Sequence, residues 1–163
     1  MKKRKLLFVG IGLMASILIH ACTPSQKSTG YGMVATLQLE EEIEGVCDNS
    51  NVIAILPIPG NGQVKAKAPM TDNEITDLLN SEVQFLDGKL DYEDKGMVML
   101  IINCEGDMVQ CSTSNKTKSE ELDAQIVKVF STMKEWKPGT INGKPVDTSV
   151  LYSFTITDGE ITL

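Results

Sequence analysis

The sequence predicts a mixed α+β fold, in which a small antiparallel sheet packs on a helix. Two amphipathic segments with helix-capping residues occupy residues 71–80 and 119–134. Short apolar or alternating segments lie around them, separated by Gly, Asn, Asp and Pro. Over residues 92–163 the order of elements is β-β-α-β, with a short last strand. A β-rich N-terminal segment and one short helix precede this unit.

The N-terminus has the organisation of an export signal. Residues 2–5 are basic, residues 6–21 are mainly apolar, and Cys22 follows the lipobox-like Ile19-His20-Ala21. We therefore expect residues 1–21 to be a lipoprotein signal peptide and Cys22 to be lipidated as the mature N-terminus. Since no Asp follows Cys22, the expected location is the outer membrane, with the lipid-anchored protein facing the periplasm.

The next two segments differ in composition. Residues 22–32, rich in Ser, Thr, Gly and Lys, predict a short flexible tether. Residues 33–70 predict a β-rich N-terminal subdomain. Its expected strands are residues 33–39, 52–56 and 64–68, and its turn-rich connection is residues 57–62. The acidic residues 40–44 lack the spacing of a calcium loop, and we interpret them as a solvated strand end.

Residues 71–91 predict a linking helix and an acidic connection. Thr71 and Glu74 have the spacing of a capping box. Ile75, Leu78 and Leu79 then supply an apolar face down to about residue 80. We expect this helix to pack on the C-terminal sheet or to join the two parts of the chain.

The unit at residues 92–163 begins with a hairpin. Residues 97–102 are continuously apolar and predict a strand that is buried on both faces. Glu105-Gly106-Asp107 is the expected turn, and residues 108–113 are the return strand. Ser119 is the expected N-cap of the following helix. The apolar stripe of that helix is Leu122, Ile126, Val129, Phe130 and Met133.

A linker and a long strand follow this helix. Pro138 and Gly139 end the helix, and Asn142-Gly143 supplies a turn. Residues 148–156 alternate as in a strand with two different faces. One face of this strand carries Thr148, Val150, Tyr152, Phe154 and Ile156. Asp158-Gly159 is a hairpin signal, which leaves residues 160–163 for the short closing strand.

Three cysteines besides Cys22 are candidates for a disulfide, which an exported protein favours. A turn at Glu105-Gly106 would place Cys111 opposite Leu100, too far from Cys104 for a bridge. A turn at Asp107-Met108 would place Cys104 and Cys111 directly opposite each other. We favour Cys104–Cys111 if the register allows it. The alternatives are a bridge from Cys47 to one of them, or three free thiols.

Composition excludes several classes of function. The net charge of −7 argues against nucleic acid as a partner, since its binding requires neutralisation of phosphates. The single histidine, His20, lies in the signal segment, so the mature chain lacks the base of a Ser-His or Cys-His site and any His ligand for zinc. Phosphate-loop and dinucleotide motifs are absent. We therefore expect neither an enzyme nor a bound metal or cofactor.

An ordered set of motifs in residues 92–163 resembles the TonB C-terminal domain family. The matching residues are Gly96-Met97-Val98, Glu105-Gly106, Leu122-Asp123, Trp136-Lys137-Pro138-Gly139 and Asn142-Gly143-Lys144-Pro145-Val146. The order and spacing of this set make it specific, whereas any one motif is weak. One departure lies at the start of the unit, where this chain has Asp91-Tyr92-Glu93-Asp94. The family often carries Tyr-Pro and a small residue there.

The resemblance implies a function in protein interaction. The family's domain binds a short peptide of outer-membrane transporters by adding it as a strand to its sheet. The corresponding strand edge here would carry Thr148, Val150, Tyr152, Phe154 and Ile156. Two arrangements would occupy that edge within the protein itself: the closing strand could cover it, or a homodimer could form through it. The first hypothesis is therefore an envelope lipoprotein whose partner is an outer-membrane transporter or another envelope protein.

Two alternatives remain open. The family's energy transducers keep an N-terminal inner-membrane anchor with a Ser and a His four residues apart, as are Ser16 and His20. This would make the chain a transducer, but its apolar stretch is shorter than the ~20 residues that a spanning helix needs. The other alternative is a structural envelope lipoprotein that binds no peptide.

Overall fold

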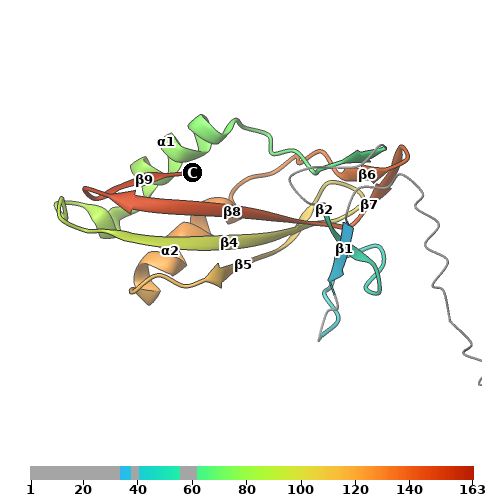
Figure 1. Cartoon of the computed structure of the whole chain (residues 1–163), viewed down its shortest axis with the longest axis horizontal. Helices are drawn as coiled ribbons and strands as arrows, with labels where there is room; N and C mark the ends of the chain where they lie inside the picture. The colour runs from blue at the N-terminus through green and yellow to red at the C-terminus, as the bar shows by residue number, and fades with distance from the viewer. Residues whose placement is uncertain (1–33, 38–40, 56–61) are drawn as a thin grey trace, which may run out of the picture.

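A twisted sheet of six strands forms the framework of the computed structural model, which describes residues 34–37, 41–55 and 62–163 (Figure 1). The strands lie in the order β1 (Val34–Leu37), β2 (Val52–Ile55), β8 (Thr148–Thr157), β4 (Asp94–Ile102) and β5 (Met108–Asn115). The sixth strand, β9 (Glu160–Thr162), also pairs with β8. The predicted α+β class is confirmed, but the sheet is larger than the small sheet that we expected.

The sheet is larger because strands from residues 33–70 join it. β2 pairs in parallel with β8 through Ile53–Thr148 and Ala54–Ser149, and β1 pairs antiparallel with β2. These N-terminal strands therefore complete the sheet of the C-terminal unit. Pairing between segments so far apart in the sequence depends on the folded topology, which local patterns do not encode.

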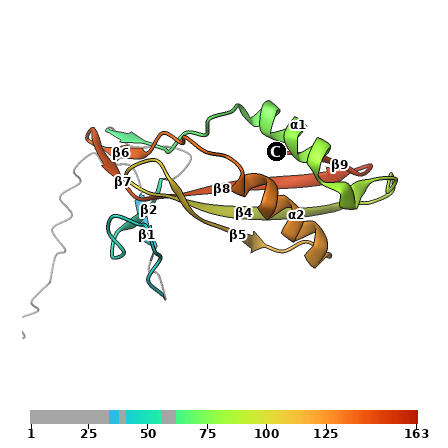
Figure 2. The same cartoon turned by 180° about the vertical axis from the view of Figure 1, so that it is seen from behind.

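A second, three-stranded sheet consists of β3 (Gln63–Val64), β6 (Gly139–Ile141) and β7 (Lys144–Val146). Figures 1 and 2 both place it near the end of the long sheet where β8 begins. β6 and β7 form a hairpin around Asn142 and Gly143, both at positive φ. These two strands lie between the helix and β8 in the sequence, so the simple β-β-α-β order is wrong at this point.

Both main helices begin where capping chemistry predicts. α1 (Asp72–Glu82) has a capping box, in which the Glu74 N–H donates to Thr71 Oγ1 at 3.3 Å and the Thr71 N–H donates to Glu74 Oε2 at 2.7 Å. α2 (Glu120–Ser131) begins after Ser119, whose Oγ accepts from the Leu122 N–H at 3.3 Å. A 3₁₀ turn, η1 (Gln84–Leu86), follows α1.

One face of the long sheet and the two helices enclose the core. The helices contribute Ile75, Leu79, Leu122, Ile126 and Phe130, and the sheet contributes Val98, Leu100, Ile102, Phe154 and Ile156. On the opposite face of β4, Ile101 is buried but Met97 and Met99 are half-buried. The expectation of burial on both faces therefore holds only towards the end of β4. The other face of the sheet stays partly open beside β8.

Candidate functional site

β8 has one fully paired side and one partly open side. β4 pairs with it along residues 148–156. On the other side, β2 pairs with residues 148 and 149, and β9 pairs with residues 155–157. Among the described residues, no strand pairs with residues 150–154 on this side, and we call this stretch the β8 gap. It is a section of sheet edge with a neighbouring strand at each end.

Two hydrogen bonds show which backbone groups face the gap. At one end, the Asp147 carbonyl accepts from the Ile53 N–H at 2.9 Å on the β2 side. At the other end, the Thr155 carbonyl accepts from Thr162 Oγ1 at 3.3 Å on the β9 side. Alternate residues of a strand direct their backbone groups to the same side. Leu151 and Ser153 therefore direct their N–H and C=O groups into the β8 gap.

A hollow of about 330 Å³ follows this edge. Val150 and Ala66 line it on the face that packs against the helices. Leu151, Ser153 and Met97 line it from the opposite face, where Met97 lies across from Ser153. Leu151 is 53% exposed, which makes it one of the most exposed large apolar side chains in the described residues. An unpaired edge with apolar walls is suited to binding an extended chain.

The predicted edge residues all lie on β8, but their side chains face the core. Thr148, Phe154 and Ile156 are buried, whereas Val150 and Tyr152 are half-buried. The backbone groups that face the gap belong instead to Leu151 and Ser153, which sequence reasoning missed. The sequence did contain a sign of this face, because Leu151 interrupts a row of Ser and Thr at alternate positions of the strand.

β9 closes one end of the gap and is held by α1. The Asn80 side chain donates to the Ile161 carbonyl at 2.9 Å and accepts from the Ile161 N–H at 2.8 Å. The amide side chain thus occupies the position that a neighbouring strand would take. The Ile161 side chain is fully buried in the core. Displacing β9 would break both hydrogen bonds and expose this side chain.

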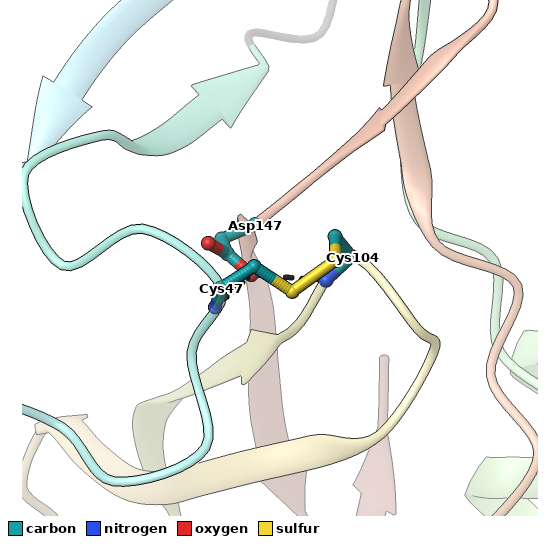
Figure 3. Close-up of side chains that lie close together, drawn as sticks. All are labelled: Cys47, Cys104 and Asp147. Atoms are coloured by element: carbon teal, nitrogen blue, oxygen red, sulfur yellow. Dashed lines mark hydrogen bonds between the residues drawn. A yellow bond between two sulfur atoms is a disulfide. The ribbon is translucent and has the colours of Figure 1, made fainter.

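A disulfide lies near the other end of the gap, and it joins Cys47 to Cys104 (Figure 3). The favoured Cys104–Cys111 bridge is therefore wrong, and the alternative bridge from Cys47 is present. The physical reason is the register of the hairpin, which places Cys111 opposite Leu100. Cys111 keeps a free, half-buried thiol that donates to the Val127 carbonyl, with Sγ and O 3.6 Å apart. Burial raises the pKa of this thiol.

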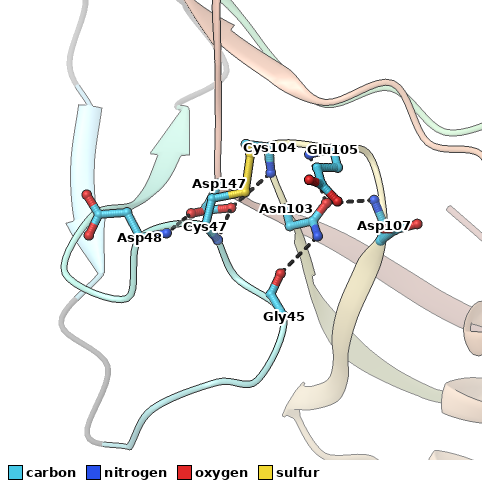
Figure 4. Close-up of a disulfide and its surroundings, with 8 residues drawn as sticks. All are labelled: Gly45, Cys47, Asp48, Asn103, Cys104, Glu105, Asp107 and Asp147. Carbon is cyan, nitrogen blue, oxygen red and sulfur yellow. Dashed lines mark hydrogen bonds between the residues drawn. A yellow bond between two sulfur atoms is a disulfide. The ribbon is translucent and has the colours of Figure 1, made fainter.

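Asp147, the residue before β8, connects the disulfide to the sheet. Asp147 is 2% exposed, and its carboxylate accepts three backbone N–H bonds. Oδ1 accepts from Cys47 at 3.1 Å and from Cys104 at 2.9 Å, while Oδ2 accepts from Asp48 at 2.7 Å (Figure 4). The two sulfurs and a carboxylate oxygen lie within 4.8 Å of one another. Because a disulfide offers no thiolate ligand, this cluster acts as a structural clamp.

Asn103 extends the same clamp. Its side-chain N–H donates to the Gly45 carbonyl at 2.9 Å, and its side-chain oxygen accepts from the N–H groups of Glu105 and Asp107 (Figure 4). The loop that leads into β2 is thus attached to the β4–β5 turn. Together with Asp147, this attachment holds β2 against the start of β8.

The residues that carried the family resemblance have structural roles. Leu122 is buried in the core, and one oxygen of Asp123 accepts from the Thr117 N–H at 3.0 Å. The Trp136 ring lies edge-on to Tyr152, with their centroids 6.4 Å apart. Since Tyr152 is the middle residue of the β8 gap, Trp136 supports the gap from the helix side.

The turn residues of the same motifs allow close packing. A side chain at Gly106 would collide with the Trp136 carbonyl, and one at Gly139 would collide with Thr148. Pro138 lies beside Gly106, and Asn142 and Gly143 form the β6–β7 turn. These residues therefore secure the linker and contribute no reactive group.

The predicted signal peptide (1–21), Cys22, the tether (22–32), and most of the turn at 57–62 lie outside the described residues. Among the helices of the described ranges, none combines the length and apolar character needed to cross a membrane. No protein-family model, curated protein or solved structure matches this chain.

Proposed function

We propose that this chain is a non-enzymatic interaction module of the bacterial envelope, which binds an extended peptide of an outer-membrane transport component. The peptide would add as a strand to the β8 gap. The observation that carries the proposal is the backbone of Leu151 and Ser153, which no strand of the described residues pairs on this side and which borders a mainly apolar hollow. A sheet edge of this kind supplies main-chain hydrogen bonds for an added strand.

The motif resemblance supports the same site independently. The motifs from Gly96 to Val146 resemble those of the TonB C-terminal domain, and the resemblance implies peptide addition to the strand that corresponds to β8. The lipobox-like sequence before Cys22 supports an outer-membrane lipid anchor facing the periplasm as part of the proposal. A lipid anchor there separates the module from an inner-membrane motor, so the proposal is peptide binding without energy transduction.

The backbone groups that face the gap give only weak affinity by themselves. The N–H and C=O groups of Leu151 and Ser153 can form hydrogen bonds worth about 1 kcal/mol each after loss of water. Their sum is about 4 kcal/mol, which at most offsets the ~4–15 kcal/mol that association costs in translational and rotational freedom. Tighter binding therefore requires apolar side chains of the peptide to pack on Leu151, Val150 and Met97.

A proline substitution tests this mode directly. Ser153→Pro removes the N–H that faces the gap and leaves the pairing with β4 in place, since proline is tolerated where a strand N–H points outward. Ser153→Ala is the matched control, because it keeps that N–H. Synthetic N-terminal peptides of outer-membrane transporters would be titrated into ¹⁵N-labelled protein. We expect amide shifts at Leu151 and Ser153, and binding at least tenfold weaker for Ser153→Pro alone.

Two results would count against peptide binding at this site. One is the absence of shifts along β8 with every transporter peptide, which would favour a structural lipoprotein. The other is equal affinity for the proline variant and the wild type. Circular dichroism of both variants would establish that they are folded.

A further inference from the structure

We propose that Cys47, Cys104 and Asp147 form a redox-gated zinc site. Once the S–S bond is reduced, the two thiolates and the carboxylate bind one Zn²⁺ ion. The three residues come from the loop before β2, the β4–β5 turn and the position that precedes β8. Their donor atoms lie within 4.8 Å of one another (Figure 3), and among the described residues this is the only group of its kind. The site is independent of peptide binding at β8.

A reductant can reach the disulfide because Cys47 is exposed, whereas Cys104 is half-buried. A thiolate of a dithiol reductant attacks Cys47 Sγ, the S–S bond breaks, and Cys104 leaves as a thiolate. The second thiolate of the reductant then attacks its own sulfur in the mixed disulfide, which releases Cys47. The reductant loses two electrons and becomes a disulfide, and its two protons pass to the two thiols of the protein.

The hydrogen bonds around the site do not depend on the S–S bond. The N–H groups of Cys47 and Cys104 donate to Asp147 Oδ1 at 3.1 and 2.9 Å, and a third backbone N–H donates to Oδ2 at 2.7 Å. The Asn103 side chain donates to the Gly45 carbonyl at 2.9 Å. These bonds keep the two thiols beside the carboxylate after reduction. Binding costs less when the ligand atoms are held in place before the metal arrives.

The set of donor atoms indicates zinc. Ca²⁺ and Mg²⁺ prefer oxygen ligands, whereas Zn²⁺ binds thiolate sulfur and carboxylate oxygen together. Two ligand atoms of one tetrahedral zinc lie roughly 3.5–3.8 Å apart, since Zn–S and Zn–O bonds are about 2.3 and 2.0 Å long. The three donor atoms already lie within 4.8 Å of one another, so small side-chain rotations bring them around one ion. A water molecule then completes the four ligands.

Charge also favours a bound cation in the reduced protein. Asp147 is buried, and two thiolates beside its carboxylate would repel it and each other. A divalent cation among the three groups replaces this repulsion by attraction. Binding of Zn²⁺ displaces the two thiol protons, and the ion takes over the cross-link that the S–S bond provided. The loop before β2 and the β4–β5 turn therefore stay joined in both redox states.

Metal titrations of the full chain test the site. The parent protein would carry Cys22→Ala, which leaves Cys47, Cys104 and Cys111 as its cysteines, and a phosphine would keep it reduced. Cd²⁺ reports thiolate ligands through its charge-transfer absorption, and competition with a coloured chelator measures the affinity for Zn²⁺. We expect one equivalent of either metal to bind to the reduced protein and none to bind to the oxidised protein.

Four variants of this parent identify the ligands. Cys47→Ser and Asp147→Asn should each weaken Zn²⁺ binding at least tenfold, because each removes a charged ligand. Cys111→Ser and Asp107→Asn are the matched controls, since their side chains lie outside the cluster, and they should bind as tightly as the parent. Circular dichroism would establish that each variant is folded. Zn²⁺ should also raise the urea midpoint of the reduced parent and leave that of the oxidised protein unchanged.

Three results would overturn the proposal. Absence of the Cd²⁺ absorption in the reduced parent would remove the site, and this measurement requires no variant to fold. Loss of the absorption in Cys111→Ser would show that the metal binds elsewhere. Unchanged affinity in a folded Asp147→Asn protein would contradict the carboxylate ligand, and if that variant fails to fold, unchanged affinity in Cys47→Ser would contradict the cluster.

Discussion

Asp147 is the residue that links the most distant parts of this chain. Its carboxylate accepts from residues 99 and 100 positions earlier in the sequence, and from Cys104. Hydrogen bonds to a charged acceptor contribute about 1.5–3 kcal/mol each, more than neutral ones. The buried carboxylate is thus compensated by three donors, and its loss would leave those donors unpaired.

We predict that Asp147→Asn lowers the free energy of unfolding by about 2–4 kcal/mol, because the amide nitrogen would meet an N–H donor and the charge would be lost. Urea denaturation of the oxidised protein, followed by the fluorescence of Trp136, would measure this change. Asp107→Asn is the control, since that side chain is exposed. A change below about 0.5 kcal/mol for Asp147→Asn would show that the carboxylate is dispensable.

The free thiol of Cys111 makes the free energy of unfolding depend on pH. Burial raises its pKa in the folded protein, whereas unfolding returns it to about 8.5. As the pH rises, the Cys111 thiol therefore loses its proton in the unfolded state before it does so in the folded state. Its contribution to the free energy of unfolding is complete below about pH 8.5 and falls as the pH rises towards the folded pKa. We expect the free energy of unfolding, measured by urea denaturation, to fall less between about pH 8 and 9.5 in Cys111→Ala than in the wild type. Parallel curves for the two proteins would contradict this.

At the scale of elements, β9 pairs with β8 on one side, and a helix side chain in place of another strand holds its other side. It has three residues, yet its central residue is fully buried and both backbone groups of that residue bond to Asn80. The hairpin turn at Gly159 adds an N–H bond to the Tyr92 carbonyl at 3.2 Å. α1 therefore has a second role besides packing, since it covers the outer edge of β9.

We predict that Asn80→Ala destabilises the protein by about 1–3 kcal/mol, because two backbone groups of Ile161 lose their partners. Hydrogen exchange at Ile161 should accelerate more than exchange in β4. Asn73→Ala, at an exposed position of the same helix, is the matched control and should change little. Equal effects of the two substitutions would point to helix propensity instead of the contact with β9.

The elements differ in how far the sequence could predict them. The caps at Thr71 and Ser119, and the hairpin that places Cys111 opposite Leu100, follow from neighbours within a few residues. β6 and β7 escaped prediction because each is three residues long, and turn residues dominate the linker. The pairing of β8 with β2 and β9 also escaped, since it joins segments far apart in the sequence.

At the scale of the whole molecule, the expected lipid anchor at Cys22 gives a prediction about location. We predict that fatty acid labels the wild-type protein in bacteria and that Cys22→Ala abolishes the label, because Cys22 is the expected acceptor. Each buried CH₂ contributes ~0.8 kcal/mol, so several acyl chains anchor the protein stably. Metabolic labelling followed by membrane fractionation would test this, with Cys111→Ala as the control. An unlabelled wild-type protein in the inner membrane would favour the transducer alternative.

The sequence by itself determined the α+β class, both principal helices, the β4–β5 hairpin and the long strand β8. These features arise from side-chain periodicity, caps and turns, which act over a few neighbouring residues. Only the tertiary structure decided that Cys47 pairs with Cys104, and that β2 and β9 both pair with β8 on the side opposite β4. These contacts join residues far apart in the chain, and their formation depends on how all the elements pack together.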